Sequence, residues 1–133
     1  MPITNEYRPD GVILWHHGQI TDDMLLEANR AIYEHDYPQG MRFQVIDLSD
    51  VTSYDVTGET MRQLAAMDVE QSPDALACAI APDDLTYGMC RIWITMAEEG
   101  PLQIEIFRSP DDATAWLHSQ GIDIELSHRE DAP

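Results

Sequence analysis

Apolar and polar positions along the chain follow two periods, and the first elements that they predict are a β-hairpin and a helix. Residues 3–8 and 12–20 are extended segments, and Pro9-Asp10-Gly11 between them is typical of a tight turn. Gly18 is expected to break or bulge the second of these strands. Thr21 then precedes a helix as its N-cap, and the apolar residues at helical spacing are Leu25, Ala28 and Ile32.

The middle of the chain predicts two buried strands joined by a second helix. The short apolar runs at residues 43–48 and 76–81 are typical of parallel strands that are covered on both faces. Between them, the polar residues 49–55 are expected to form a turn, and a helix starts near Val56 and ends at Ser72-Pro73-Asp74. The residues of this helix expected to face inward are Met61, Leu64 and Ala65.

A third helix has the clearest amphipathic pattern in the chain. It opens at Pro82-Asp83-Asp84 and ends at Gly100-Pro101. Its apolar stripe, expected to be buried, consists of Leu85, Met89, Ile92, Trp93 and Met96. Residues 102–107 alternate in polarity after it and predict a further strand.

The last helix and the tail complete a predicted α/β domain. Ser109 is the expected N-cap, Pro110 occupies the first helical position, and Gly121 ends the helix. Residues 122–126 alternate, so that the segment 122–133 is predicted to be either a late edge strand or an extended tail on the surface. The order of elements predicts a single domain, residues 1–133, with a mixed, mostly parallel sheet of about five strands and four helices.

The charge of the chain narrows the classes of partner. Its 133 residues contain 25 Asp and Glu against seven Lys and Arg, a net charge of −18, and all seven basic residues are Arg. Nucleic acid and anionic membrane surfaces are excluded as expected partners, because both are bound through basic patches. Two interpretations of the acidity stay open. The first is adaptation to a salty cytoplasm, which the even spread of acidic residues along the chain favours. The second is an acidic face that attracts a basic protein.

No catalytic or metal-binding motif is present in the sequence. Cys78 and Cys90 lie in apolar segments and are expected to be buried thiols in a reducing compartment. His16 and His17 are adjacent on a strand, so their side chains point to opposite faces and cannot share a metal ion. We therefore expect a cytoplasmic protein that is not an enzyme and has no metal or cofactor.

Residues 45–58 resemble a known family signature. The run V-I-D-L-S-D-V-T-S-Y-D-V-T-G is similar to that of anti-sigma-factor antagonists, in which a strand ending in Asp-Leu-Ser leads to Asp-Ser-Ser-Gly at a helix start. Residues 77–82 and residues 104–113 resemble later elements of the same family. The chain thus resembles the SpoIIAA-like proteins of the STAS superfamily over residues 11–120, which implies their fold and a regulatory, protein-binding role.

The family's phosphorylated serine has no counterpart here. By the resemblance, Asp55 and Gly58 match the first and last residues of Asp-Ser-Ser-Gly, while the switch serine falls on Val56, which has no hydroxyl group. Thr57 matches the second serine. It is either a displaced phosphate acceptor or a structural residue at the helix start, and the structural interpretation is favoured. We expect no phosphorylation switch at this position.

Two functional hypotheses follow. The first is a non-catalytic module that binds an unidentified protein, or a second copy of itself, through Ser53, Asp55, Val56, Thr57, Gly58, Arg62, Asp84, Tyr87 and Arg91. The alternative is a carrier of a small apolar ligand or lipid, with a pocket lined by Met89, Trp93 and Met96. A cavity larger than about 300 Å³ would favour the carrier.

The salt-adaptation interpretation predicts that the fold is stabilised by NaCl. The excess of 18 negative charges repels itself at low ionic strength, and screening within about 3 Å at 1 M salt reduces that repulsion. The melting temperature should rise between about 0.05 and 1 M NaCl, as measured by circular dichroism. A flat or falling melting temperature over that range would contradict this interpretation and favour an acidic docking face.

Overall fold

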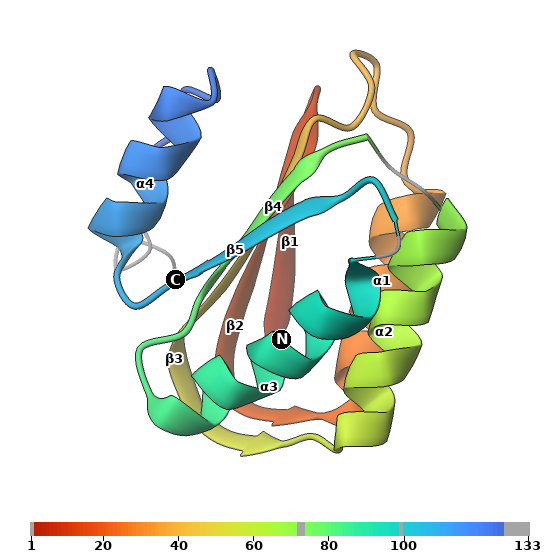
Figure 1. Ribbon diagram of the computed structural model, residues 1–133, viewed down its shortest axis with the longest axis vertical. Coiled ribbons are helices and arrows are strands. Elements are labelled where there is room, and N and C mark those ends of the chain that lie inside the picture. The colour runs from red at the N-terminus through yellow and green to blue at the C-terminus, as the bar shows by residue number, and fades with distance from the viewer. Residues whose placement is uncertain (1, 72–73, 99, 127–133) are drawn as a thin grey trace.

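Five strands lie side by side in the order in which they occur in the chain, as the computed structural model in Figure 1 shows. The structure describes residues 2–71, 74–98 and 100–126. Its strands are β1 (Ile3–Arg8), β2 (Gly11–Thr21), β3 (Phe43–Asp55), β4 (Leu76–Ile80) and β5 (Gln103–Phe107). Its helices are α1 (Asp22–Glu34), α2 (Gly58–Gln71), α3 (Asp84–Ala97) and α4 (Pro110–Ser119).

The strand directions confirm the predicted α/β fold class. β1 pairs antiparallel with β2 as the hairpin, and β2 to β5 run parallel to one another. Each parallel pair is joined by one helix, because parallel neighbours need a crossover connection. The described residues thus form the mixed sheet of five strands with four helices that the sequence pattern predicted.

The two faces of the sheet are covered by different helices. Helices α1, α2 and α3 lie on one face, and α4 with the chain that follows it lies on the other (Figure 1). Alternation along β4 divides its side chains between the two layers: Ala77 and Ala79 pack under the three helices, whereas Cys78 and Ile80 pack against α4. The near-continuous apolar run of β4 is explained by this double burial.

Strand β3 is longer than the sequence predicted. Residues 49–55 were expected to form a turn, but they continue the strand to Asp55 because β2 pairs with them as far as Thr21. The register shifts between Trp15 and His17, and again between Gly18 and Gln19. At both points β3 has an extra residue, so the pairing absorbs two β-bulges. The expected irregularity at Gly18, with its positive φ of 72°, is confirmed.

The buried stripe of α3 is displaced by one residue from the predicted one. The buried side chains are Thr86, Cys90, Trp93 and Ala97. Leu85 and Met96, which were expected to face inward, are 59% and 45% exposed. Three of the four buried residues are small, which lets α3 lie close to its neighbours, and the larger apolar residues remain at the flanks.

Residues 122–126 form an extended tail and no strand. Ile122, Ile124 and Leu126 are buried in the layer between α4 and the sheet, and the two residues between them are exposed. The alternating pattern therefore reflects an extended segment laid on the protein surface, the second of the two predicted alternatives. The rest of the predicted tail, and the predicted end of α2 at residues 72–73, lie outside the described residues.

Gly11 predicts a sharp steric test of the β2–β3 pairing. A Cβ atom on Gly11 would lie 2.4 Å from two carbon atoms of the Phe43 ring, and Phe43 is almost completely buried. Gly11→Ala should therefore lower the free energy of unfolding by about 1–3 kcal/mol. Gly88 on α3 has no neighbour within 4 Å of such an atom. Gly88→Ala should accordingly raise the free energy of unfolding by about 0.5–1 kcal/mol.

Urea unfolding of the two variants at one fixed salt concentration measures both effects. A Gly11→Ala variant as stable as the wild type would contradict the close contact between Gly11 and the Phe43 ring.

Candidate functional site

The junction between β3 and α2 is held by Thr57 and Asp22. The Thr57 hydroxyl accepts a hydrogen bond from the Thr60 backbone N–H at 3.2 Å, as an N-cap does. The Thr57 backbone N–H donates to Asp22 Oδ1 at 2.9 Å, and its hydroxyl donates to Asp22 Oδ2 at 3.2 Å. The hydrogen bond from the Thr57 backbone holds the pKa of Asp22 below its usual value. A carboxylate of this chain thus occupies the N-terminal end of α2.

Val56 is half-buried and packs against the main core. Its side chain therefore has a packing role just before α2. Helix α2 begins at Gly58, two residues after the start that the sequence predicted, because Val56 and Thr57 form the capping segment.

The start of α3 is fixed by a second cap and by an arginine. Asp83 Oδ1 accepts a hydrogen bond from the Thr86 backbone N–H at 2.9 Å. The Arg108 guanidinium, which follows β5, donates to Asp84 and to the Pro82 carbonyl oxygen. It also lies 4.1 Å from the centre of the Tyr87 ring, a cation–π contact. Two predicted partner-binding residues, Asp84 and Tyr87, are thus brought together.

A groove of about 440 Å³ lies between the end of β3 and the start of α3. We call it the docking groove, and its residues are Gln19, Val51, Thr52, Ser53, Tyr54, Asp55, Asp83, Leu85 and Thr86. Ser53 and Asp55 were predicted as partner-binding residues, and both line it. Leu85 was missed because the helical pattern assigned it to the core. Arg62 and Arg91 are exposed residues of α2 and α3 and do not line the groove.

The surroundings of the docking groove are acidic. Asp55 and Asp83 line it, and Glu59 follows within the first turn of α2. Arg62 Nη1 lies 3.3 Å from Glu59 Oε2. This salt bridge joins two exposed side chains and contributes little to the free energy of unfolding. The groove thus presents one apolar side chain, Leu85, beside the carboxylates of Asp55 and Asp83.

A buried carboxylate connects helices α1, α2 and α3. Asp68 of α2 is 2% exposed. It accepts hydrogen bonds from Tyr33 Oη of α1 at 2.5 Å and from Trp93 Nε1 of α3 at 2.6 Å. Gln44 of β3 donates to the same Tyr33 oxygen at 3.0 Å. Burial raises the pKa of Asp68, and hydrogen bonds from Tyr33, Trp93 and Asn29 oppose that shift.

Asp68 was not among the residues predicted from the sequence, although its spacing contained a signal. Met61, Leu64 and Asp68 recur at intervals of three and four residues, so helical periodicity places the carboxylate on the inward face of α2.

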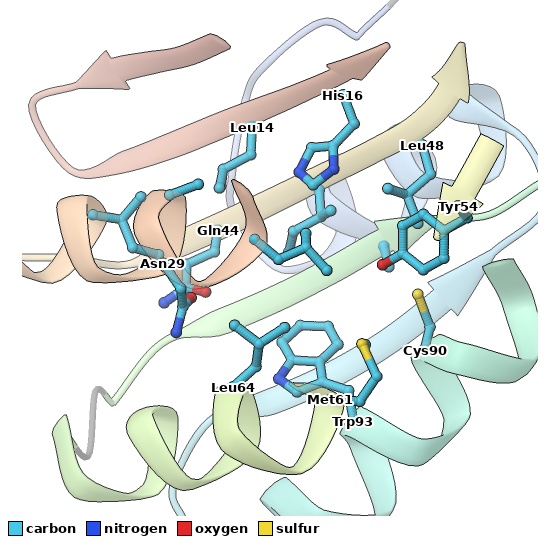
Figure 2. A pocket seen from close by; sticks show the side chains of 15 residues that line it. Leu14, His16, Asn29, Gln44, Leu48, Tyr54, Met61, Leu64, Cys90 and Trp93 are labelled. Atoms are coloured by element: carbon cyan, nitrogen blue, oxygen red, sulfur yellow. The ribbon is translucent and has the colours of Figure 1, made fainter. Parts of the chain in front are cut away.

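An interior cavity of about 50 Å³ lies between the sheet and helices α1, α2 and α3. Figure 2 shows its lining, and we call it the core cavity. Eleven lining residues are apolar: Leu14, Leu25, Ala28, Ile32, Ile46, Leu48, Met61, Leu64, Ala79, Cys90 and Trp93. The four polar ones are His16, Asn29, Gln44 and Tyr54. Of the three pocket residues predicted from sequence, Trp93 lines this cavity, while Met89 is half-buried elsewhere in the core and Met96 is exposed.

His16 is the unusual member of this lining. It is 2% exposed, and within the described residues neither ring nitrogen has a hydrogen-bond partner. Burial, with a smaller contribution from the neighbouring His17, lowers the pKa of the His16 imidazole to about 3. The period-two pattern Val12, Leu14, His16 contained the signal that this ring faces the helices.

Nucleophilic and metal chemistry find little support in the described part of the chain. Burial raises the pKa of the Cys78 and Cys90 thiols to about 12, which keeps them protonated and unreactive at neutral pH. Among the described residues, no three His, Cys, Asp or Glu side chains are grouped so that they could hold a metal ion. No helix within residues 2–71, 74–98 and 100–126 has the length and apolar character to cross a bilayer.

Comparison with known proteins finds a likeness in fold. Neither a family model nor a curated protein matches the chain. Among solved structures, a similar one is the crystal structure of an uncharacterized protein of the DUF3478 family, with a SpoIIAA-like fold, from Shewanella loihica PV-4. The two are 17% identical with a TM-score of 0.49, over 86% of this chain and 91% of that one.

The low pKa of His16 predicts that acid destabilises the protein through this residue. The ordinary histidine pKa in an unfolded chain is about 6.5. Between that value and about 3, unfolding takes up a proton at His16, so stability falls as the pH falls. The contribution of His16 to the free energy of unfolding should be smaller at pH 5.5 than at pH 8 by about 1.4 kcal/mol.

Urea unfolding at these two pH values, with wild type, His16→Phe and His17→Phe, measures this effect. His16→Phe should lose less stability on acidification than the wild type does, by about 1.4 kcal/mol. His17 is exposed, so His17→Phe should behave nearly as the wild type. Equal acid sensitivity in wild type and His16→Phe would show that His16 does not remain neutral in the folded protein.

Proposed function

We propose that this chain is a non-catalytic regulatory module that binds a basic protein partner through the docking groove. The observation that carries the proposal is Leu85, a 59% exposed leucine beside a groove bordered by carboxylates. Protein interfaces have an apolar core surrounded by a polar rim, and Leu85 beside the carboxylates of the groove matches that arrangement. The net charge of −18 favours a partner of opposite charge and works against association of two copies of this chain.

The proposed binding does not depend on a phosphate switch. Val56 cannot be phosphorylated, and the Thr57 hydroxyl is engaged with Asp22 and the first turn of α2. A phosphate on Thr57 would lie beside the Asp22 carboxylate, and repulsion between the like charges opposes it. We therefore propose that the partner binds the unmodified chain.

The carrier hypothesis is less well supported by the size of the interior space. It required a cavity larger than about 300 Å³, the lower end for sites that bury drug-sized ligands. The core cavity holds about 50 Å³, and Met96 lies outside it. A lipid chain does not fit into that volume.

The function is tested with two variants on the same helix. Leu85→Ser removes the proposed anchor, and Met96→Ser removes the other exposed large apolar side chain of α3 and serves as the matched control. Immobilised wild-type chain is used to recover partners from extracts of the host at the salt concentration of its cytoplasm, and each recovered protein is purified. Calorimetric titration then gives its dissociation constant for the wild type and both variants.

We expect a basic partner whose binding weakens about tenfold or more with Leu85→Ser and is unchanged with Met96→Ser, because an anchor residue contributes at least about 1.4 kcal/mol. Its affinity should also fall as salt is raised, since opposite charges are screened. Equal effects of the two variants would place the interface elsewhere. A partner that is acidic, or binding that salt leaves unchanged, would contradict the electrostatic part of the proposal.

A further inference from the structure

The imidazole of His16 faces the core cavity by the alternation of β2, beside an irregularity in the sheet. His16 lies in β2 at the point where the β2–β3 register shifts, opposite the extra residue of β3. Bulges of this kind redirect side chains and are frequent near functional sites. In Figure 2 the ring lies between Leu14 and Leu48 and points toward the space above Met61 and Trp93.

An imidazole in this position lacks what buried polar groups ordinarily have. Both nitrogens are buried without a partner among the described residues, although a neutral imidazole offers one donor and one acceptor. A buried polar group left without a hydrogen bond destabilises the folded state, so most such groups in proteins are satisfied by protein or by a bound molecule. A phenylalanine or leucine would fill the same space without this cost. The presence of an imidazole at this position is therefore explained if a bound molecule forms a hydrogen bond with it.

Two of the three other polar side chains of the cavity, Gln44 and Asn29, are not arranged to hold water at His16. A buried water needs two to four polar partners. The amide nitrogen of Gln44 is already bonded to Tyr33, and that of Asn29 lies 3.8 Å from the sulfur of Met67. Figure 2 shows both amides well apart from the His16 ring, whose neighbours in the view are aliphatic. A molecule with one polar group and an apolar body matches this lining better than water does.

We propose that the core cavity is a binding site for a small uncharged molecule that has an apolar body and one hydroxyl group, and that His16 forms the hydrogen bond to that hydroxyl. The volume of about 50 Å³ limits the ligand to a few non-hydrogen atoms, since a cavity of roughly 150 Å³ accommodates one benzene molecule. The absence of a cationic side chain from the lining excludes an anion of the same size, because burying an unpaired charge is costly.

This site is distinct from the docking groove, but one residue borders both. Tyr54 lines the core cavity and also the groove, and burial raises the pKa of its hydroxyl, which keeps it neutral. A ligand in the core cavity would lie against Tyr54, and a shift of Tyr54 would alter the docking groove. The binding test below uses no partner protein, so its outcome is independent of the proposed function.

The test uses 1-propanol as the probe, which has four non-hydrogen atoms and one hydroxyl. Acetate, with the same number of non-hydrogen atoms and a negative charge, is the matched control ligand. The chain is labelled with ¹⁵N in its histidine rings, and each ligand is titrated while the ring ¹⁵N resonances and the melting temperature are recorded. Xenon serves as a probe of the apolar volume alone.

Three variants locate the site. His16→Phe removes the hydrogen-bonding group, and His17→Phe makes the same substitution on the exposed neighbour. Ala79→Val leaves His16 in place and narrows the cavity from β4. Far-ultraviolet circular dichroism and a cooperative melting transition verify that each variant is folded before it is titrated.

We expect 1-propanol to shift the His16 ring resonances along a saturable, single-site curve and to raise the melting temperature of the wild type and of His17→Phe. Affinity should fall about tenfold in His16→Phe, the loss of one hydrogen bond, while xenon binding persists there. Ala79→Val should bind neither 1-propanol nor xenon. Acetate should bind to none of the four proteins.

Three results would overturn the proposal. The first is a response to 1-propanol that does not saturate. The second is equal affinity for 1-propanol in the wild type and in His16→Phe. The third is a high-resolution structure in which ordered waters alone satisfy both His16 nitrogens in the presence of saturating 1-propanol.

Discussion

The carboxylate of Asp68 joins three helices, α1, α2 and α3, within a mostly apolar layer. It lies in the layer above the sheet, where solvation of a charge by water is lost, and its two oxygens are satisfied by Tyr33 from α1 and Trp93 from α3. Because hydrogen bonds have directional requirements that apolar packing lacks, this group fixes how the three helices are placed relative to one another. The positions of the cavity and of the groove depend on that placement.

The same network forms one wall of the core cavity. Trp93 and Gln44 belong both to the hydrogen-bonded cluster and to the cavity lining. Since Trp93 is held by Asp68, its ring is not free to turn into the space beneath His16, and the cavity persists in an otherwise closely packed layer. The polar cluster thus preserves space, while the aliphatic lining makes that space suitable for a small and mostly apolar molecule.

The functional proposals place different chemistry at the two ends of one structural unit. At the surface, caps from Thr57 and Asp83 fix the starts of α2 and α3, and the groove between β3 and α3 presents Leu85 among carboxylates. In the interior, a neutral imidazole faces an apolar cavity. Tyr54 lies between these two environments, at the far end of the strand that the bulges lengthen and bend.

The amino-acid sequence by itself determined the elements, their order and the α/β class, because side-chain periodicity and capping residues act locally. The hairpin turn, the caps at Asp83 and Ser109, and the apolar run of β4 all depend on residues close together in the chain. Only the tertiary structure decided how far β3 extends and which residues of α3 are buried. Pairing with β2 extended β3 through a polar segment, and close packing by small residues turned Leu85 outward. The isolation of the His16 nitrogens likewise depends on which atoms from distant segments surround the ring, and local sequence does not specify those contacts.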